Sequence, residues 1–161
     1  MKDLLIIALL LVILWLVMNR QSSGFASVGD TLRPGTFLEG DKALVSQNGK
    51  YKAVMQMDGN LVILNASNNK IWESGTFNTQ QQGTALRPGT LVARVAPDGS
   101  FQIYAKNEEG GPGGSAWKII SPVKGNNLSF GLVMKDNGNL AVVRRTNNGE
   151  NIVWNTQTAG K

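Results

Sequence analysis

The chain of 161 residues contains no cysteine and no histidine. Disulfide bonds, thiol nucleophiles and histidine general bases are therefore excluded, and so are the usual zinc sites. The 11 acidic residues are dispersed, and only Glu108 and Glu109 are adjacent. No phosphate-binding loop follows a strand and opens a helix. We therefore expect a protein that is not an enzyme and that uses neither a metal nor another cofactor.

A strong excess of one charge is also absent. The formal net charge is +5, the charged residues are scattered, and Arg144–Arg145 is the only tight basic pair. This pattern is typical of a solvated surface, and we expect no nucleic-acid binding.

Glycine, by contrast, is abundant, with 19 residues that often follow Asn or Asp. Such pairs mark tight turns, and the length suffices for one domain with a hydrophobic core. The composition therefore predicts an all-β chain with many short strands. In the first part of this chain we expect strands near residues 36–39, 43–47, 51–56 and 61–65.

The stretch from Met55 to Asn65 reads MQMDGNLVILN. Its Asp-Gly pair is a strong hairpin signal, and an apolar, partly β-branched strand follows the turn. Because side chains alternate along a strand, Asn60, Val62 and Leu64 share one face. Together with Gln56 and Asp58 they form a small polar pocket on a rigid sheet.

The same pattern recurs twice more. Turns begin at positions 58, 98 and 137, so the spacings are 40 and 39 residues. A tryptophan follows each turn: Trp72, Trp117 and Trp154. Repeats of this length are supersecondary units that bury one shared core. We expect the three tryptophans to meet in that core.

The first copy resembles the Gln-x-Asp-x-Asn-x-Val-x-Tyr signature of the bulb-type (monocot) mannose-binding lectins. It carries Gln56, Asp58, Asn60 and Val62, with Leu64 in place of the tyrosine. The similarity extends over roughly residues 29 to 158. It implies a β-prism domain over residues 29–161, with three antiparallel four-stranded sheets around a pseudo-threefold axis.

The resemblance also implies carbohydrate-binding residues, and the candidates are Gln56, Asp58, Asn60 and Val62. An ionised Asp accepts hydrogen bonds from sugar hydroxyls, while the amides donate and accept. The second copy departs from the signature at Ala96, Ser100 and Gln102, and the third departs at four of its five positions. The alternative is that the motif is retained because it makes the turn.

The N-terminal residues Leu4 to Met18 are an unbroken apolar run. As a helix, 15 residues span about 22 Å, which Lys2 and Arg20 extend toward bilayer thickness by snorkelling. We predict a transmembrane anchor over residues 1–20 and a linker over residues 21–28. The alternative is a signal peptide with a weak cleavage site at Gly24-Phe25-Ala26. Lys2 and Arg20 leave the orientation of the anchor open.

Two functions follow from this organisation. The first is a single-pass membrane protein that ties a membrane to a neighbouring protein layer, for example a minor capsid protein in the virion of a large membrane-containing virus. The alternative is a membrane-bound lectin for mannose-type glycans. The glycine-rich stretch Asn107 to Ser115 is expected to be an exposed loop, either a surface insertion or a partner contact.

Overall fold

The computed structural model describes residues 25–77, 80–81, 84–85, 89–106, 112–119 and 129–161, with the backbone alone for residues 80–81, 84–85 and 112–119. The described residues form strands and turns and no helix, which confirms the all-β prediction. None of them belongs to a helix long and apolar enough to cross a membrane. The expected anchor at residues 1–20 lies outside the described residues, as do linker residues 21–24.

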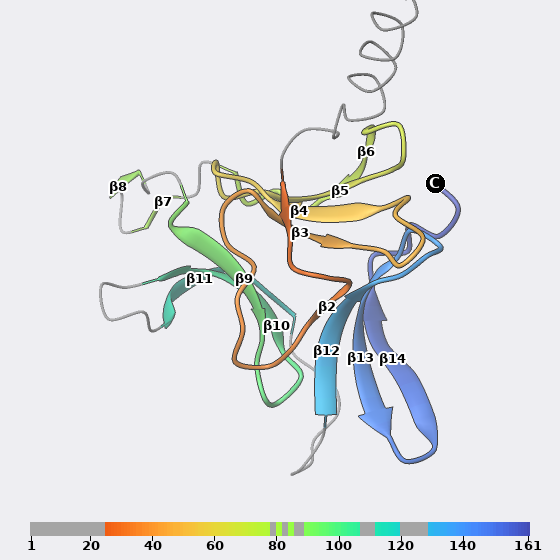
Figure 1. Ribbon diagram of the computed structural model, residues 1–161. Helices are drawn as coiled ribbons and strands as arrows, with labels where there is room; N and C mark the ends of the chain where they lie inside the picture. Colours follow the sequence, from red (N-terminus) through yellow and green to blue (C-terminus); the bar gives the residue numbers. More distant parts are fainter. Residues whose placement is uncertain (1–24, 78–79, 82–83, 86–88, 107–111, 120–128) are drawn as a thin grey trace, which may run out of the picture.

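Three sheets correspond to the three predicted repeats (Figure 1). The first, ordered β1-β3-β4-β5-β6, contains β1 (Ala26–Ser27), β3 (Lys42–Val45), β4 (Lys52–Met55), β5 (Leu61–Leu64) and β6 (Lys70–Glu73). The second, ordered β11-β10-β9, contains β9 (Leu91–Val95), β10 (Phe101–Lys106) and β11 (Pro112–Ile119). The third, ordered β14-β13-β12-β2, contains β2 (Thr31–Leu32), β12 (Ser129–Met134), β13 (Leu140–Thr146) and β14 (Gly149–Asn155). A separate hairpin joins β7 (Gln80–Gln81) to β8 (Thr84–Ala85).

One segment, residues 31–45, supplies an outer partner to each sheet in turn. β2 pairs with β12, where Leu32 opposes Leu132. Leu38 then forms an isolated antiparallel bridge with Ala93 of β9, and β3 pairs with β4. Since β4, β9 and β12 each lead into a motif turn, the three pairings are equivalent. The segment therefore ties all three repeats together.

The sheets differ from the expected three sheets of four strands. The first gains β1, which pairs in parallel with β3, and the second has a single bridge where a fourth strand was expected. β1 lies inside the stretch that we expected to be linker. Pro112 to Ser115, expected to be loop, is strand backbone because Lys106 opposes Pro112 and Tyr104 opposes Ser115 across β10 and β11. Residues 107–111 of that stretch lie outside the described residues.

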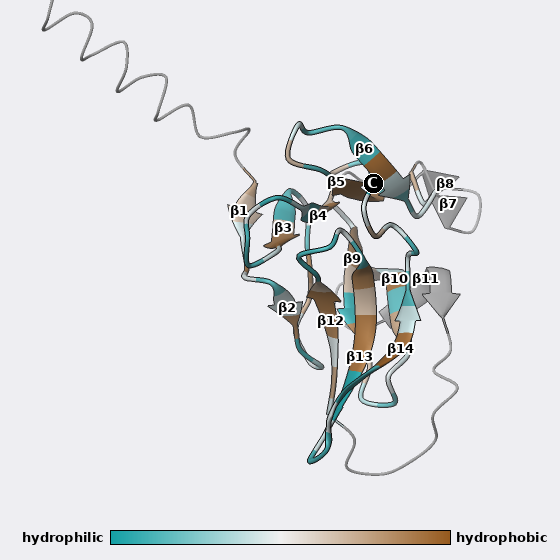
Figure 2. Ribbon diagram, turned by 90° about the vertical axis from the view of Figure 1, so that its right-hand side faces the viewer, coloured by the Kyte–Doolittle hydropathy of each residue, from teal (hydrophilic) through white to brown (hydrophobic). Residues whose placement is uncertain are grey.

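The hydrophobic core lies where the inner faces of the three sheets meet. Apolar residues run along β5, β9, β12 and β13 in Figure 2. One buried cluster draws on all three sheets, with Ile63, Ile103 and Leu132 among its members. Trp72 and Trp154 pack against this cluster, and their ring centroids lie 6.4 Å apart in an edge-to-face arrangement. The prediction that these two tryptophans meet is confirmed, and the side chain of Trp117 lies outside what the structure describes.

The motif turns pack each repeat against the next in a cycle. A Cβ built on Gly59 would lie 2.5 Å from Leu91 of the second repeat, and one on Gly99 would lie 2.5 Å from Phe130 of the third. A Cβ on Gly138 would lie 2.8 Å from Tyr51, back in the first repeat. The glycine of each Asp-Gly or Asn-Gly pair is thus also an inter-repeat contact.

Candidate functional site

The first motif turn joins β4 to β5. Its backbone is closed by hydrogen bonds from Gly59 N to Gln56 O (3.0 Å) and from Gln56 N to Asn60 O (2.9 Å). Asp58 is exposed, and its Oδ1 accepts a hydrogen bond from Asn60 N at 2.9 Å. One carboxylate oxygen of Asp58 therefore holds the turn, in the manner of an Asx-turn.

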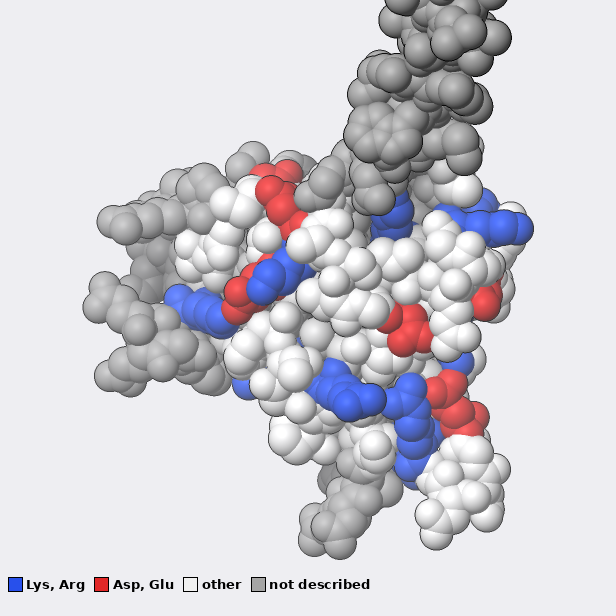
Figure 3. All heavy atoms as spheres, in the orientation of Figure 1, with Lys and Arg blue, Asp and Glu red and all other residues white. Residues whose placement is uncertain are grey.

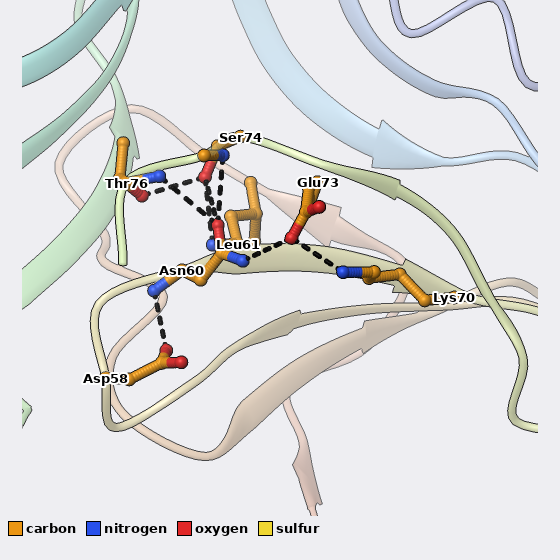
Figure 4. A network of polar contacts seen from close by, with 8 residues as sticks. Asp58, Asn60, Leu61, Lys70, Glu73, Ser74 and Thr76 are labelled. Atoms are coloured by element: carbon orange, nitrogen blue, oxygen red, sulfur yellow. Dashed lines mark hydrogen bonds and ion pairs between the residues drawn. The ribbon is translucent and has the colours of Figure 1, made fainter. Parts of the chain in front are cut away.

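Asn60 is buried, with 4% of its surface exposed, and its amide is largely used within the chain (Figure 4). Its Oδ1 accepts from Ser74 Oγ at 3.1 Å, from Gly75 N at 3.1 Å and from Thr76 N at 3.3 Å. Its Nδ2 donates to Glu73 Oε2 at 2.8 Å. Since a primary amide has two N–H donors, the bond to Glu73 leaves a second N–H for which the described residues show no acceptor.

Glu73 completes this network on the outer side. Lys70 Nζ donates to the same Oε2 atom at 2.8 Å. The hydrogen bond from Lys70, followed by that from Asn60, holds the pKa of the Glu73 carboxyl below its ordinary value of 4.5. Glu73 is therefore an ionised acceptor that fixes the orientation of the Asn60 amide.

The third repeat reproduces the network. Asn139 Oδ1 accepts from Thr158 N at 2.6 Å, and Thr158 Oγ1 donates to Gly138 O at 2.6 Å. Thr76 Oγ1 donates to Gly59 O at the same distance in the first repeat. The asparagine thus fastens the chain after the last strand of its sheet to the motif turn, in two repeats that differ in most other motif residues.

The second repeat shows no such fastening among the residues that the structure describes, and Ser121, at the position of Thr76, lies outside them. Ser100 occupies the asparagine position, and its buried hydroxyl has no hydrogen-bond partner in the described part of the chain. Ile119, opposite Phe101, occupies the position of Ser74 in the first repeat. Isoleucine has no hydroxyl with which to accept the bond that Ser74 Oγ accepts from Leu61 N at 3.0 Å.

The hydroxyl side of this network was not predicted from the sequence, although the sequence contains a signal for it. The first repeat reads Trp72-Glu-Ser-Gly-Thr and the third reads Trp154-Asn-Thr-Gln-Thr, so two hydroxyl residues stand two and four positions after each tryptophan. The second repeat reads Trp117-Lys-Ile-Ile-Ser and keeps only the last of the two. The agreement between the first and third repeats indicated a structural pairing with the motif asparagine.

The outer face of the first sheet, where the motif places Val62, is covered. Val62 is only 2% exposed and clusters with Ala43 and Val54. Phe25, just before β1, packs against this cluster together with Leu64. The four candidate residues thus lie at one turn and the strand beside it, but only Asp58 is exposed and Gln56 is half-buried.

The outer face of the second sheet is filled by a stack of rings and cations. Arg94 donates to Gln102 Oε1 through Nε (3.0 Å) and a terminal nitrogen (2.9 Å), and its guanidinium lies 4.7 Å from the Tyr104 ring centroid. Phe37 meets Tyr104 edge-on at 6.3 Å, and Lys106 Nζ lies 4.7 Å from the Phe37 ring centroid. Tyr104, the one match to the signature tyrosine, is fully buried, and its hydroxyl has no hydrogen-bond partner among the described residues.

The outer face of the third sheet is crossed by ion pairs. Glu150 pairs with Lys135 and, at 3.3 Å, with Arg145 Nε. Lys135 stands at the position of the signature glutamine, so the third copy has a paired cation where the signature has an amide. Val133, Ala141 and Val143 form a small buried cluster on this sheet. Within the described residues, no group of three or more acidic side chains is placed to hold a metal ion.

Removing the Asn60 amide is expected to destabilise the fold. Asn60→Ala leaves Gly75 N and Thr76 N without their acceptor, and an unmet buried hydrogen-bonding group costs about 1–3 kcal/mol. We expect a loss of roughly 2–3 kcal/mol in the free energy of unfolding, measured by denaturant titration. Asp58→Ala, which removes one bond at an exposed side chain, is the matched control, with a loss of about 1 kcal/mol or less. Equal losses in the two variants would contradict the structural role of Asn60.

No protein-family model matches the sequence, and no curated protein matches it. Among solved structures, the Japanese Marasmius oreades lectin aligns with a TM-score of 0.62 and 21% identity over 85% of this chain and 98% of that lectin. Monomeric monocot mannose-binding lectins from Gastrodia elata align with a TM-score of 0.61 and 23% identity, covering 81% of this chain and 98% of theirs.

A third neighbour is the mannose-specific agglutinin from snowdrop (Galanthus nivalis) bulbs, complexed with methyl-α-D-mannoside. It aligns with a TM-score of 0.51 and 22% identity over 70% of this chain and 87% of the agglutinin. At these identities the likeness concerns the fold. The chain therefore has the all-β prism fold of the bulb-type mannose-binding lectins, as the resemblance of the first motif copy implied.

Proposed function

We propose that the chain is a non-catalytic interaction module built on the lectin fold. In this proposal, residues 1–20 hold the module at a membrane, and the domain contacts a neighbouring protein layer. A minor capsid position in the virion of a membrane-containing large virus is one such setting. The chain then acts as a tether, which links the membrane to the protein layer by binding both.

The observation that carries the proposal is that side chains of this chain fill the outer faces of its sheets. Phe25 packs against the Val62 cluster in the first sheet. Arg94 and Phe37 contact Tyr104 in the second, and Glu150 bridges two cations in the third. A sugar needs open polar groups and an open apolar surface at such a site, because it exchanges hydrogen bonds with water for bonds of similar strength. The filled faces favour a protein contact elsewhere on the surface.

A second candidate function is binding of mannose-type glycans at the first motif turn. It is supported by the fold and by the names of the Gastrodia elata and snowdrop lectins, which both state mannose binding. The groups available for it are the exposed Asp58, the half-buried Gln56 and one N–H of Asn60. These groups would hold a sugar by hydrogen bonds without proton transfer.

A mannose titration separates the two functions. We expect no saturable amide shift at low-millimolar mannose, because one turn with so few open groups lacks the multivalency that strengthens weak sugar sites. A saturable shift at Gln56 and Asp58 that Asp58→Ala removes would establish the lectin function instead. Asn137→Ala is the matched control, since Asn137 Oδ1 accepts from Asn139 N (3.1 Å) in the third turn as Asp58 does in the first.

The tether itself is tested in the native assembly. Chemical cross-linking before detergent extraction, followed by mass spectrometry, is expected to yield cross-links from the domain to a neighbouring protein and an N-terminal peptide that begins at or near Met1. A mature N-terminus near Ser27 with no cross-linked neighbour would contradict the proposal.

A further inference from the structure

A groove runs along β2, away from the motif turn of the first repeat. One hollow of about 610 Å³ is lined by residues 28–33, Thr36, Phe37 and Arg145. A second hollow of about 260 Å³ shares Asp30, Thr31 and Arg145 with the first and continues toward Lys135 and Glu150. Because the two hollows share these three residues, we treat them as one feature, the β2 groove.

The β2 groove exposes the backbone of an edge strand. β2 is the last strand of its sheet. Met134 N donates to Asp30 O at 2.9 Å, and Leu32 opposes Leu132 in the same register. Since bonded and non-bonded pairs alternate in an antiparallel ladder, the N–H and C=O of Thr31 point away from β12. A free edge of this kind pairs readily with an added extended segment.

The charges of the larger hollow favour an acidic segment, whereas the smaller hollow is lined by Asp136 and Glu150 as well as by Lys135 and is not basic. Two arginines, Arg33 and Arg145, line the larger hollow with one carboxylate, Asp30. The oxygens of Asp30 are occupied, since Oδ1 accepts from Thr31 Oγ1 (2.9 Å) and Oδ2 from Gln47 Nε2 (2.8 Å). Hydrogen bonds from Gln47 and then from Thr31 hold the pKa of Asp30 below its ordinary value of 3.8. Asp30 therefore stays ionised and directed at its own partners.

The two arginines keep capacity for a ligand. Arg33 is exposed and forms no ion pair with any acidic side chain of the described residues. Arg145 contacts Glu150 through Nε at 3.3 Å. One terminal nitrogen of Arg145 reaches over β12, where it would lie 3.7 Å from a Cβ on Gly131. In Figure 3, two groups of basic side chains lie side by side in the lower part of the molecule, over the region of β12, and acidic side chains adjoin one of them.

We propose that the β2 groove binds an extended acidic peptide segment of a partner protein by strand addition to β2, with a carboxylate held between Arg33 and Arg145. The inference rests on the proposed interaction function and gives it a place and a ligand chemistry. The Thr31 backbone supplies affinity through main-chain hydrogen bonds, and the arginines supply selectivity through charge-assisted bonds to the carboxylate. Phe37, which is half-buried and lines the larger hollow, offers apolar contact to the alternate side chains.

The test uses the full chain in detergent micelles and amide NMR. The probe is the capped hexapeptide acetyl-Thr-Val-Glu-Val-Thr-Val-amide, and its two companions carry Gln in place of Glu or N-methylated peptide bonds. We expect amide shifts at Thr31 and Arg33 with the Glu probe, about tenfold weaker binding of the Gln probe, and no binding of the N-methylated probe. Arg33→Gln and Arg145→Gln are each expected to lower the affinity for the Glu probe about tenfold and to leave the affinity for the Gln probe unchanged. Lys50→Gln, at an exposed lysine outside the groove, is the control for net charge.

A pair of variants at one position isolates strand addition. Thr31→Pro removes the N–H that faces the groove and spares the bonds to β12, so it should abolish binding of the Glu probe. Thr31→Val keeps that N–H and removes the hydroxyl, so it should retain binding. Absence of shifts at β2, equal binding of the Glu and Gln probes, or retained binding in Thr31→Pro would each overturn the inference. Cross-links from another surface of the domain to a neighbouring protein would overturn this inference but leave the proposed function intact. The proposed function would instead be overturned by the absence of any cross-linked neighbour or by saturable mannose binding.

Discussion

Replacing Trp154 by alanine is expected to lower the free energy of unfolding by about 3–5 kcal/mol, the usual cost of deleting a large core aromatic. Trp154, on β14, lies 6.4 Å from Trp72 of β6 and 5.7 Å from Phe101 of β10, measured between ring centroids. The Trp154 ring therefore joins the third sheet to the other two. Its removal opens a cavity at the point where the repeats meet, and no single sheet can collapse to fill that cavity.

Denaturant titration followed by far-ultraviolet circular dichroism measures this effect. Trp154→Phe keeps a ring at the same place and should recover part of the loss. Phe77→Ala is the control for removal of an aromatic side chain, because Phe77 is 52% exposed and should cost about 0.5 kcal/mol or less. A loss below about 1 kcal/mol in Trp154→Ala would contradict the shared core.

The features that sequence predicted are those that repeat locally. The all-β class followed from the abundant glycines and their turn pairs. The meeting of Trp72 with Trp154 followed from motif turns spaced 40 and 39 residues apart, each followed by a tryptophan. The strands expected near residues 43–47, 51–56 and 61–65 correspond to β3, β4 and β5 within about two residues. These elements depend on turn chemistry and alternation, which a short stretch of sequence contains.

The features that sequence could not predict depend on distant partners. The strand β2 has only two residues and exists because Leu32 opposes Leu132 in the last repeat. Likewise, nothing local indicates that Leu38 bridges Ala93 or that β1 pairs with β3. The expected count of four strands in every sheet was therefore wrong, although the fold was right.

The candidate site shows a different limit. An asparagine that binds a sugar and one that fastens a strand need the same donors and acceptors, so the motif alone does not distinguish them. In the structure, Asn60 and Asn139 make equivalent bonds although only the first copy keeps most of the signature. The distinction came from the hydroxyls of Thr76 and Thr158 and from the burial of Val62, which require the folded chain.

Gly99→Ala is expected to destabilise the fold by roughly 2–4 kcal/mol, for two separate reasons. Gly99 has a φ of +81°, which is strained for any residue with a Cβ. The new methyl group would also lie within 2.8 Å of three ring atoms of Phe130, which is buried in the shared core. Phe130 cannot swing away without opening the contact between the second and third repeats.

Gly49→Ala separates the two contributions in the same protein. Gly49 also has a positive φ, +70°, but a Cβ there would meet nothing within 4 Å. This variant should therefore lose only the conformational part, about 1 kcal/mol. The excess loss in Gly99→Ala then measures the packing of one repeat against the next. The double variant Gly99→Ala with Phe130→Leu should recover part of that excess, since leucine vacates the ring positions nearest the new methyl group. Equal losses for Gly49→Ala and Gly99→Ala would show that the motif turns do not couple the repeats.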